Sequence, residues 1–193
     1  MKTSYDYKLA KNHNIHLGAS YLHSSIDGEN VKYSQEAESN LIANKYVSTK
    51  VKDVDTTKDL SLEALYINNS FHFQTEYIQT KVEALEDNYT FDGYYAQAGY
   101  FLFGSTKKYK QKSSKFSAKG IQNNEVELAF RYSSINLNDK DEQGGTQKDY
   151  NFAVNWYINK NLKLMGNYIM AYPSSEDYDG NFNELQARAV ISF

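Results

Sequence analysis

The chain has 193 residues, a formal net charge of −3, a single proline and no cysteine, and 15% of its residues are aromatic. Its mean hydropathy is only −0.71, but disordered chains are poor in aromatic residues and rich in proline, so we expect this chain to fold. The longest stretch without a charged side chain is Asn12–Ile26, which is shorter than the roughly 18 apolar residues of a membrane-spanning helix. The absence of cysteine excludes disulfides and thiolate metal sites, and the small net charge offers no general attraction for nucleic acid.

The first residues carry Lys2 but no apolar run, so they do not form a secretory signal peptide. We therefore expect either a cytosolic protein or a chain whose beginning is missing.

Apolar and polar residues alternate along most of the chain, which is the pattern of strands with one apolar and one wet face. In the last such segment, Leu185, Ala187 and Ala189 alternate with Gln186 and Arg188. The pattern predicts nine strands, at Tyr5–Ala10, Ile15–Ser24, Asp59–Asn68, Phe71–Lys81, Gly93–Gly104, Glu125–Ser133, Asp149–Asn159, Leu162–Tyr172 and Asn183–Phe193.

The connections between these segments alternate in length, which predicts an antiparallel sheet with a short-turn end and a long-loop end. The short turns are rich in Asn and lie at Lys11–Asn14, Asn68–Ser70 and Asn159–Asn161. The long polar loops are expected at Asp27–Thr57, Glu83–Asp92, Asn138–Lys148 and Pro173–Phe182. The exception is Ser105–Asn124, a long and strongly basic link where a short turn is due.

A soluble sandwich or barrel shows the same alternation, but three features favour a transmembrane β-barrel. The strands reach the roughly 9 to 11 residues that a tilted strand needs to cross a bilayer. Aromatic residues lie near the ends of the apolar face, as at a membrane interface; they are Tyr66, Tyr77, Tyr94, Tyr100, Tyr132, Tyr150, Trp156, Tyr168 and Tyr172. The chain also ends in Phe193 on the apolar face, like the terminal signal that the assembly machinery of bacterial outer-membrane barrels reads.

Six short blocks resemble the phosphate-selective porin O and P family, in order along the chain: His16–Tyr21, Leu62–Tyr66, Phe73–Tyr77, Gly93–Leu102, Glu127–Ser133 and Asn155–Asn159. The resemblance implies a homotrimeric outer-membrane porin of about sixteen strands, roughly twice this length. Residues 1–193 would then form a single β-barrel domain, a carboxy-terminal fragment that contributes about nine strands. An odd strand count agrees with a fragment, because bacterial single-chain barrels have even numbers.

The resemblance also implies a water-filled pore for small anions such as phosphate, with the lipid bilayer as surroundings and neither a cofactor nor catalysis. A non-selective, cation or sugar pore, or a plugged structural barrel, remains an alternative. A barrel hydrolase with Ser and His at the edge of the lumen is a remote third possibility. The family's inward-folded constriction loop is expected upstream of Met1. The four histidines lack the further ligands of a metal site, so we predict no metal.

Arginine and lysine side chains along the lumen are what the resemblance implies for guiding anions. The wet faces carry Lys8, Arg131, Lys163 and Arg188, but more carboxylates than these four cations. Pairing of Arg131 and Arg188 with Glu76, Glu127 or Glu184 is an equally good interpretation. The stronger candidate is the basic link, expected at the pore exit, although it could also be a solvated loop; its lysines are Lys107, Lys108, Lys110, Lys112, Lys115 and Lys119.

Overall fold

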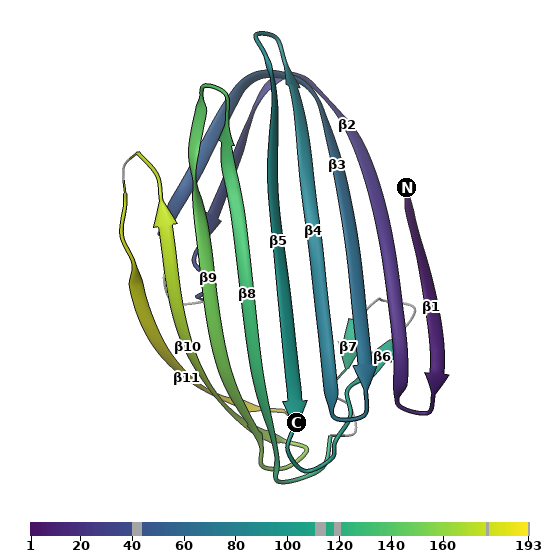
Figure 1. Cartoon of the computed structure of the whole chain (residues 1–193). Coiled ribbons are helices and arrows are strands. Elements are labelled where there is room, and N and C mark those ends of the chain that lie inside the picture. Colours follow the sequence, from purple (N-terminus) through teal and green to yellow (C-terminus); the bar gives the residue numbers. More distant parts are fainter. Residues whose placement is uncertain (40–43, 111–114, 118–120, 177, 193) are drawn as a thin grey trace.

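The computed structural model describes residues 1–39, 44–110, 115–117, 121–176 and 178–192. Nine strands form one sheet in which each pairs antiparallel with its neighbours (Figure 1). They are β1 (Lys2–Ala10), β2 (His13–Glu36), β3 (Lys45–Asn68), β4 (Phe71–Ala84), β5 (Asn88–Phe101), β8 (Glu125–Asp139), β9 (Glu142–Tyr157), β10 (Leu162–Ser174) and β11 (Phe182–Ile191). The predicted all-β antiparallel fold with nine strands is confirmed.

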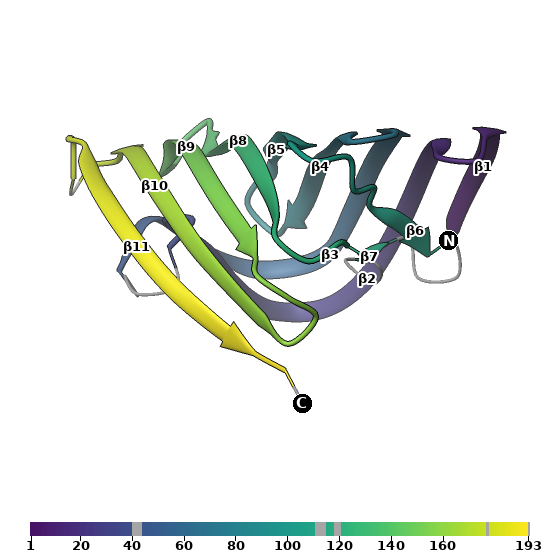
Figure 2. The same ribbon diagram turned by 90° about the horizontal axis from the view of Figure 1, so that it is seen from below.

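The sheet curves into an arc that is not closed, as the view along the strands shows (Figure 2). The arc runs from β1 at one edge to β11 at the other, in the order of the strands along the chain except for a separate pair, β6 (Lys108–Lys110) and β7 (Lys115–Ser117). None of the described residues belongs to a helix of the length and apolarity needed to span a membrane.

The register of the strands separates the two faces as the alternation predicts. Phe130 pairs with Phe152 and Phe152 with Tyr168, so these rings share the convex face of the arc, where all three are exposed. Arg131 pairs with Asn151 in the next row, on the concave face. A one-residue slip would exchange the two faces, so the apolar pattern and the register support each other.

Four tyrosines form a continuous aromatic row on the convex face. Tyr94 of β5 contacts Tyr132 of β8 with ring centroids 5.8 Å apart, Tyr132 contacts Tyr150 of β9 at 5.0 Å, and Tyr150 contacts Tyr172 of β10 at 5.9 Å. Rings with an apolar body and a polar tip suit the headgroup level of a bilayer, where such rows gather in transmembrane barrels.

Most of the predicted long loops are wrong, because strands continue through them. Residues 27–36 and 45–57 of the predicted loop Asp27–Thr57 belong to β2 and β3, and Glu83–Asp92 and Asn138–Lys148 contain only tight turns between long strands. Charged side chains concealed the alternation in these segments. The fourth predicted loop, Pro173–Phe182, is closer to the structure, because β10 ends at Ser174 and β11 starts at Phe182.

The distal halves of β2 and β3 bend inward and form a hairpin, here called the inner hairpin (residues 29–39 and 44–54), that crosses the concave side of the arc (Figures 1 and 2). The bends coincide with left-handed backbone at Asp27, Gly28 and Asp53 and with register shifts between β2 and β3. Irregularities of this kind re-aim a strand. The chain therefore has an inward-folded segment of its own, which the sequence had suggested only for residues before Met1.

The buried core lies between the inner hairpin and the sheet rather than inside one continuous layer. Val47, Val51 and Val54 of β3 pack against the concave faces of the neighbouring strands. Their partners are Val82 of β4, Tyr89 and Phe91 of β5, and Leu137 of β8. The concave face is thus apolar and covered where these residues lie.

Two consecutive glycines let β3 pass close over β9. A Cβ on Gly144 would lie 2.7 Å from Cβ of Thr49 and 2.8 Å from Cβ of Leu137. Gly145 has a φ of 92°, and a Cβ there would lie 2.7 Å from the backbone oxygen of Ser174. Only glycine fits both positions, because of the close approach at Gly144 and the left-handed backbone at Gly145.

Candidate functional site

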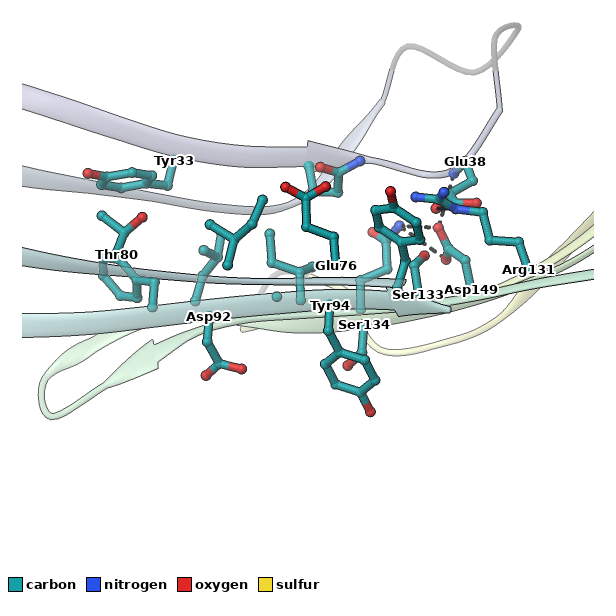
Figure 3. Close-up of a pocket in the computed structure, with 18 residues that line it drawn as sticks. Tyr33, Glu38, Glu76, Thr80, Asp92, Tyr94, Arg131, Ser133, Ser134 and Asp149 are labelled. Carbon is teal, nitrogen blue, oxygen red and sulfur yellow. Dashed lines mark hydrogen bonds and ion pairs between the residues drawn. The ribbon is translucent and has the colours of Figure 1, made fainter. Parts of the chain in front are cut away.

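The inner hairpin is fastened to the concave wall by an ion pair at its tip. Arg131 of β8 donates from Nε to Glu38 Oε1 at 2.6 Å, and Figure 3 shows Glu38, Arg131 and Asp149 grouped together. The guanidinium also donates to Gln97 at 3.0 Å and stacks 3.8 Å from the ring centroid of Tyr95. Arg131 is therefore held on several sides by protein groups.

Of the two interpretations of Arg131, pairing with a carboxylate is the one that the structure shows. The partner is Glu38, which the folded hairpin brings to it, and not Glu76, Glu127 or Glu184. Asp149 of β9 completes the attachment, since it accepts a hydrogen bond from the backbone N–H of Glu38 at 3.0 Å. The one local signal in the sequence for this arrangement is the turn-forming Asp27-Gly28 pair, which lies at the bend of β2.

The inner hairpin reaches as far as the opposite edge of the arc. Gln186 of β11 donates to Ser39 Oγ at 2.8 Å, and Tyr46 at the start of β3 packs on Tyr178 and Phe182, with ring centroids 4.8 and 5.1 Å apart. The hairpin thus connects β3 with the last strand of the sheet and narrows the space on the concave side.

The described part of the basic link lies against the concave wall at the short-turn end. Lys107 Nζ lies 2.6 Å from Glu127 Oε1 of β8, and Tyr109 of β6 places its hydroxyl 2.6 Å from His16 Nδ1 of β2. Figure 2 shows β6 and β7 inside the arc rather than beyond it. Contacts with β8 and with β2 therefore hold this part of the link in place. No acidic residue lies near Lys107 in the sequence, so its pairing with Glu127 could not be predicted.

The predicted lysines of the link have different positions. Lys108 is exposed on β6, and the backbone of Lys110 pairs with that of Lys115 of β7. Lys112 and Lys119 lie outside the described residues, as does Phe193.

Glu127 is a buried carboxylate surrounded by donors. Besides Lys107, it is bonded by His72 Nε2 at 2.9 Å, Tyr157 Oη at 2.8 Å and Asn155 Nδ2 at 3.3 Å. Gly99 makes room for this contact, since a Cβ there would lie 2.4 Å from His72 Nε2. A buried charge needs such pairing, so we interpret Glu127 as the anchor of Lys107.

Three cations gather at this end of the wall, and we call Lys107, Lys163 and Arg188 the cation cluster. Lys163 of β10 lies 4.6 Å from the ring centroid of Tyr157. Arg188 of β11 pairs in register with Met165, two residues from Lys163 on the same face of the sheet. In the part of the chain that the structure describes, neither Lys163 nor Arg188 has an ion pair. For Arg188, the alternative interpretation of a pair with a glutamate is therefore not found among the described residues.

A cavity of about 370 Å³ opens beside the cation cluster. Its lining includes the cations Lys107, Lys163 and Arg131, the amides Gln97, Asn151 and Asn155, and the single carboxylate Glu127. Three cations and three amides beside one carboxylate provide positive charge and hydrogen-bond donors for an anion.

The facing wall at the same end carries carboxylates that already have cationic or imidazole partners. His16 lies between Asp6 at 2.6 Å and Glu63 at 3.1 Å, and Lys2 lies 2.9 Å from the same Glu63 oxygen. Lys8 is exposed on β1 and belongs to neither group. The surplus of wet-face carboxylates is thus partly neutralised within the β1–β3 wall.

Comparison with known proteins agrees with this architecture. Residues 4–193 match the family described as "Phosphate-selective porin O and P". The chain belongs to this family. It is 32% identical over 148 residues to Porin O of Pseudomonas aeruginosa, and this match covers 65% of the chain and 34% of that relative.

A second relative is an uncharacterized protein of Caulobacter vibrioides, 28% identical over 196 residues. That match covers 93% of the chain and 39% of the relative. The chain therefore spans about two fifths or less of the length of these relatives. The open antiparallel arc of nine strands is consistent with a fragment of a porin barrel.

Proposed function

We propose that this chain is part of a bacterial outer-membrane porin through which small anions such as phosphate diffuse passively. Family membership supports the porin, and the exposed apolar face with its row of tyrosines supports the membrane setting. The cation cluster is the observation that carries the anion preference. The chain is proposed to act as a channel rather than as an enzyme.

The arrangement of the cluster favours conduction over tight binding. Lys163 and Arg188 have no ion pair among the described residues, so their charges act on the lumen, while Glu127 positions Lys107 and offsets part of its charge. A group of cations along one wall raises the local concentration of anions without enclosing them. Arg131 contributes less, because Glu38 and Gln97 already engage its guanidinium.

The test is the zero-current potential of the full-length protein in a planar bilayer under a salt gradient. We expect an anion-selective sign that Lys163→Gln combined with Arg188→Gln shifts towards cations, with weaker inhibition of chloride current by phosphate. Lys160→Gln is the matched control, because Lys160 is exposed in the turn between β9 and β10. A cation-selective native pore, or a potential that the double variant leaves unchanged, contradicts the proposal.

Two further parts of the proposal concern assembly. A homotrimer and recognition of Phe193 by the outer-membrane assembly machinery remain predictions. Deletion of Phe193 in the full-length protein should lower the amount of folded porin in the outer membrane while total synthesis stays the same.

A further inference from the structure

A second cavity, of about 250 Å³, lies between the inner hairpin and the sheet (Figure 3). Its floor is a row of neighbouring residues on four strands: Glu76 of β4, Tyr95 of β5, Ser133 of β8 and Asp149 of β9. Tyr33 of the hairpin lies above the other end. The cavity is distinct from the one beside the cation cluster, although Arg131 borders both.

One end of this cavity is acidic. Glu38, Glu76 and Asp149 line it with one cation, Arg131. Because Arg131 pairs with Glu38, Glu76 and Asp149 are left without a cationic partner among the described residues. Asp92 also borders the cavity but points to the opposite side of the sheet in Figure 3, so it does not contribute.

A buried acceptor at the same end lacks a donor. Gln147 is only 2% exposed, and its Nε2 donates to both oxygens of Asp149 at 3.1 and 2.9 Å. These bonds fix the amide orientation, so Oε1 is the free end, and it has no hydrogen-bond partner in the described part of the chain. An unsatisfied buried acceptor costs free energy, and a ligand that donates a hydrogen bond would remove this cost.

The other end of the cavity is apolar. Tyr33 and Phe91 pack with ring centroids 5.4 Å apart, and Ile78, Ile135 and Leu137 continue this surface. Gly93 lies between Ile78 and Ile135 in the same row, and its missing side chain leaves space on the floor. An apolar body can therefore lie within reach of the acidic end.

The geometry points to a binding site for a primary ammonium that carries a compact apolar or aromatic body. The ammonium would donate to Asp149 and to Gln147 Oε1, with Glu76 adding negative charge, and the body would cover Ile78 and Ile135. A metal ion fits less well, because no group of acidic or histidine side chains among the described residues is spaced to hold one. This ligand is a cation, so the site is separate from the proposed anion path.

The test uses the full-length protein in lipid nanodiscs and phenethylammonium as the probe, with binding measured by calorimetry at pH 7. The neutral probe 2-phenylethanol has a similar shape and no charge. We expect Asp149→Asn to weaken phenethylammonium binding at least tenfold and 2-phenylethanol to bind at least tenfold more weakly than the amine. Glu184→Gln is the control, because Glu184 lies on the concave face of β11 but outside the cavity.

A second variant guards against an indirect effect, because Asp149 also holds the backbone of Glu38. Glu76→Gln leaves the hairpin contacts in place, and we expect it to weaken amine binding several-fold. Equal affinity for the amine and the alcohol, or an amine affinity that neither Asp149→Asn nor Glu76→Gln changes, overturns the proposal. Both results can occur in a porin that remains anion-selective, so they leave the proposed function untouched.

Discussion

Glu38 and Arg131, 93 positions apart in the sequence, form the ion pair that fastens the inner hairpin to the concave wall. Their side chains are 17% and 31% exposed, so water screens the pair only in part. Hydrogen bonds to charged groups contribute about 1.5–3 kcal/mol, and the pair is therefore a substantial part of what keeps the hairpin in place.

Glu38→Gln should loosen the hairpin without unfolding the barrel. We expect faster hydrogen exchange of backbone amides in residues 44–54 and a larger single-channel conductance, because the hairpin narrows the lumen. Glu29→Gln is the control, since Glu29 is exposed on the same hairpin. Equal exchange rates in the two variants would show that other contacts hold the hairpin alone.

Gly144→Ala should push the hairpin away from β9, because the new Cβ would lie within 3.0 Å of Thr49 and Leu137. The chain has no cysteine, so a Ser39→Cys and Gln186→Cys pair can report on the contact between the hairpin and β11. We expect efficient disulfide formation in this background and a marked loss of it with Gly144→Ala. Gly166→Ala, where a Cβ would meet nothing within 4 Å, should leave the crosslink intact.

Phe152→Lys should destabilise the inserted barrel by about 2–4 kcal/mol, the cost of a lysine on the lipid face near the bilayer midplane. Phe152 is 47% exposed on the convex face. Asn167→Lys on the concave face of β10 should cost far less, because that face is wet. Unfolding by urea in lipid vesicles measures both, and similar losses would contradict the assignment of the two faces.

Asp87, in the turn between β4 and β5, should titrate below its ordinary pKa of 3.8. The Lys140 ammonium and the Asn88 backbone N–H bond to its carboxylate and lower its pKa. Because the pKa is lowered on folding, the contact stabilises the fold above about pH 4 and is lost as the pH falls through the folded pKa. The carboxyl NMR shift measures the midpoint, which should rise in Lys140→Met; an unchanged midpoint would show that Lys140 is not the cause.

The strands and their faces could be predicted from the sequence because alternation is a local property. Tyr150, Phe152 and Val154 alternate with polar neighbours, and the structure places them together on the convex face. The same reasoning failed between Asp27 and Thr57. Val47, Thr49 and Val51 alternate there with polar neighbours, but the charged residues Asp53 and Asp55 led to the prediction of a loop. The charges there belong to the bend and to the exposed side of an inward-folded strand.

The partners of charged residues could not be predicted, because they depend on contacts between distant segments. Nothing near Lys107 in the sequence indicates Glu127, and nothing near Arg131 indicates Glu38. The periodicity of the sequence predicted that Arg131, Lys163 and Arg188 lie on the wet face. Only the positions of the folded hairpin and link show which of these cations is paired.

The inner hairpin also has a consequence for the order of assembly. The contacts of Ser39 with Gln186 and of Tyr46 with Phe182 connect the inner hairpin with β11, the last strand of the sheet. Strands β4 to β10 lie between the two partners in the sequence. Contacts between segments so far apart in the sequence form slowly, so we expect the hairpin to dock late in folding. Once docked, it acts as an internal brace that connects β3 with β11 across the concave side of the sheet.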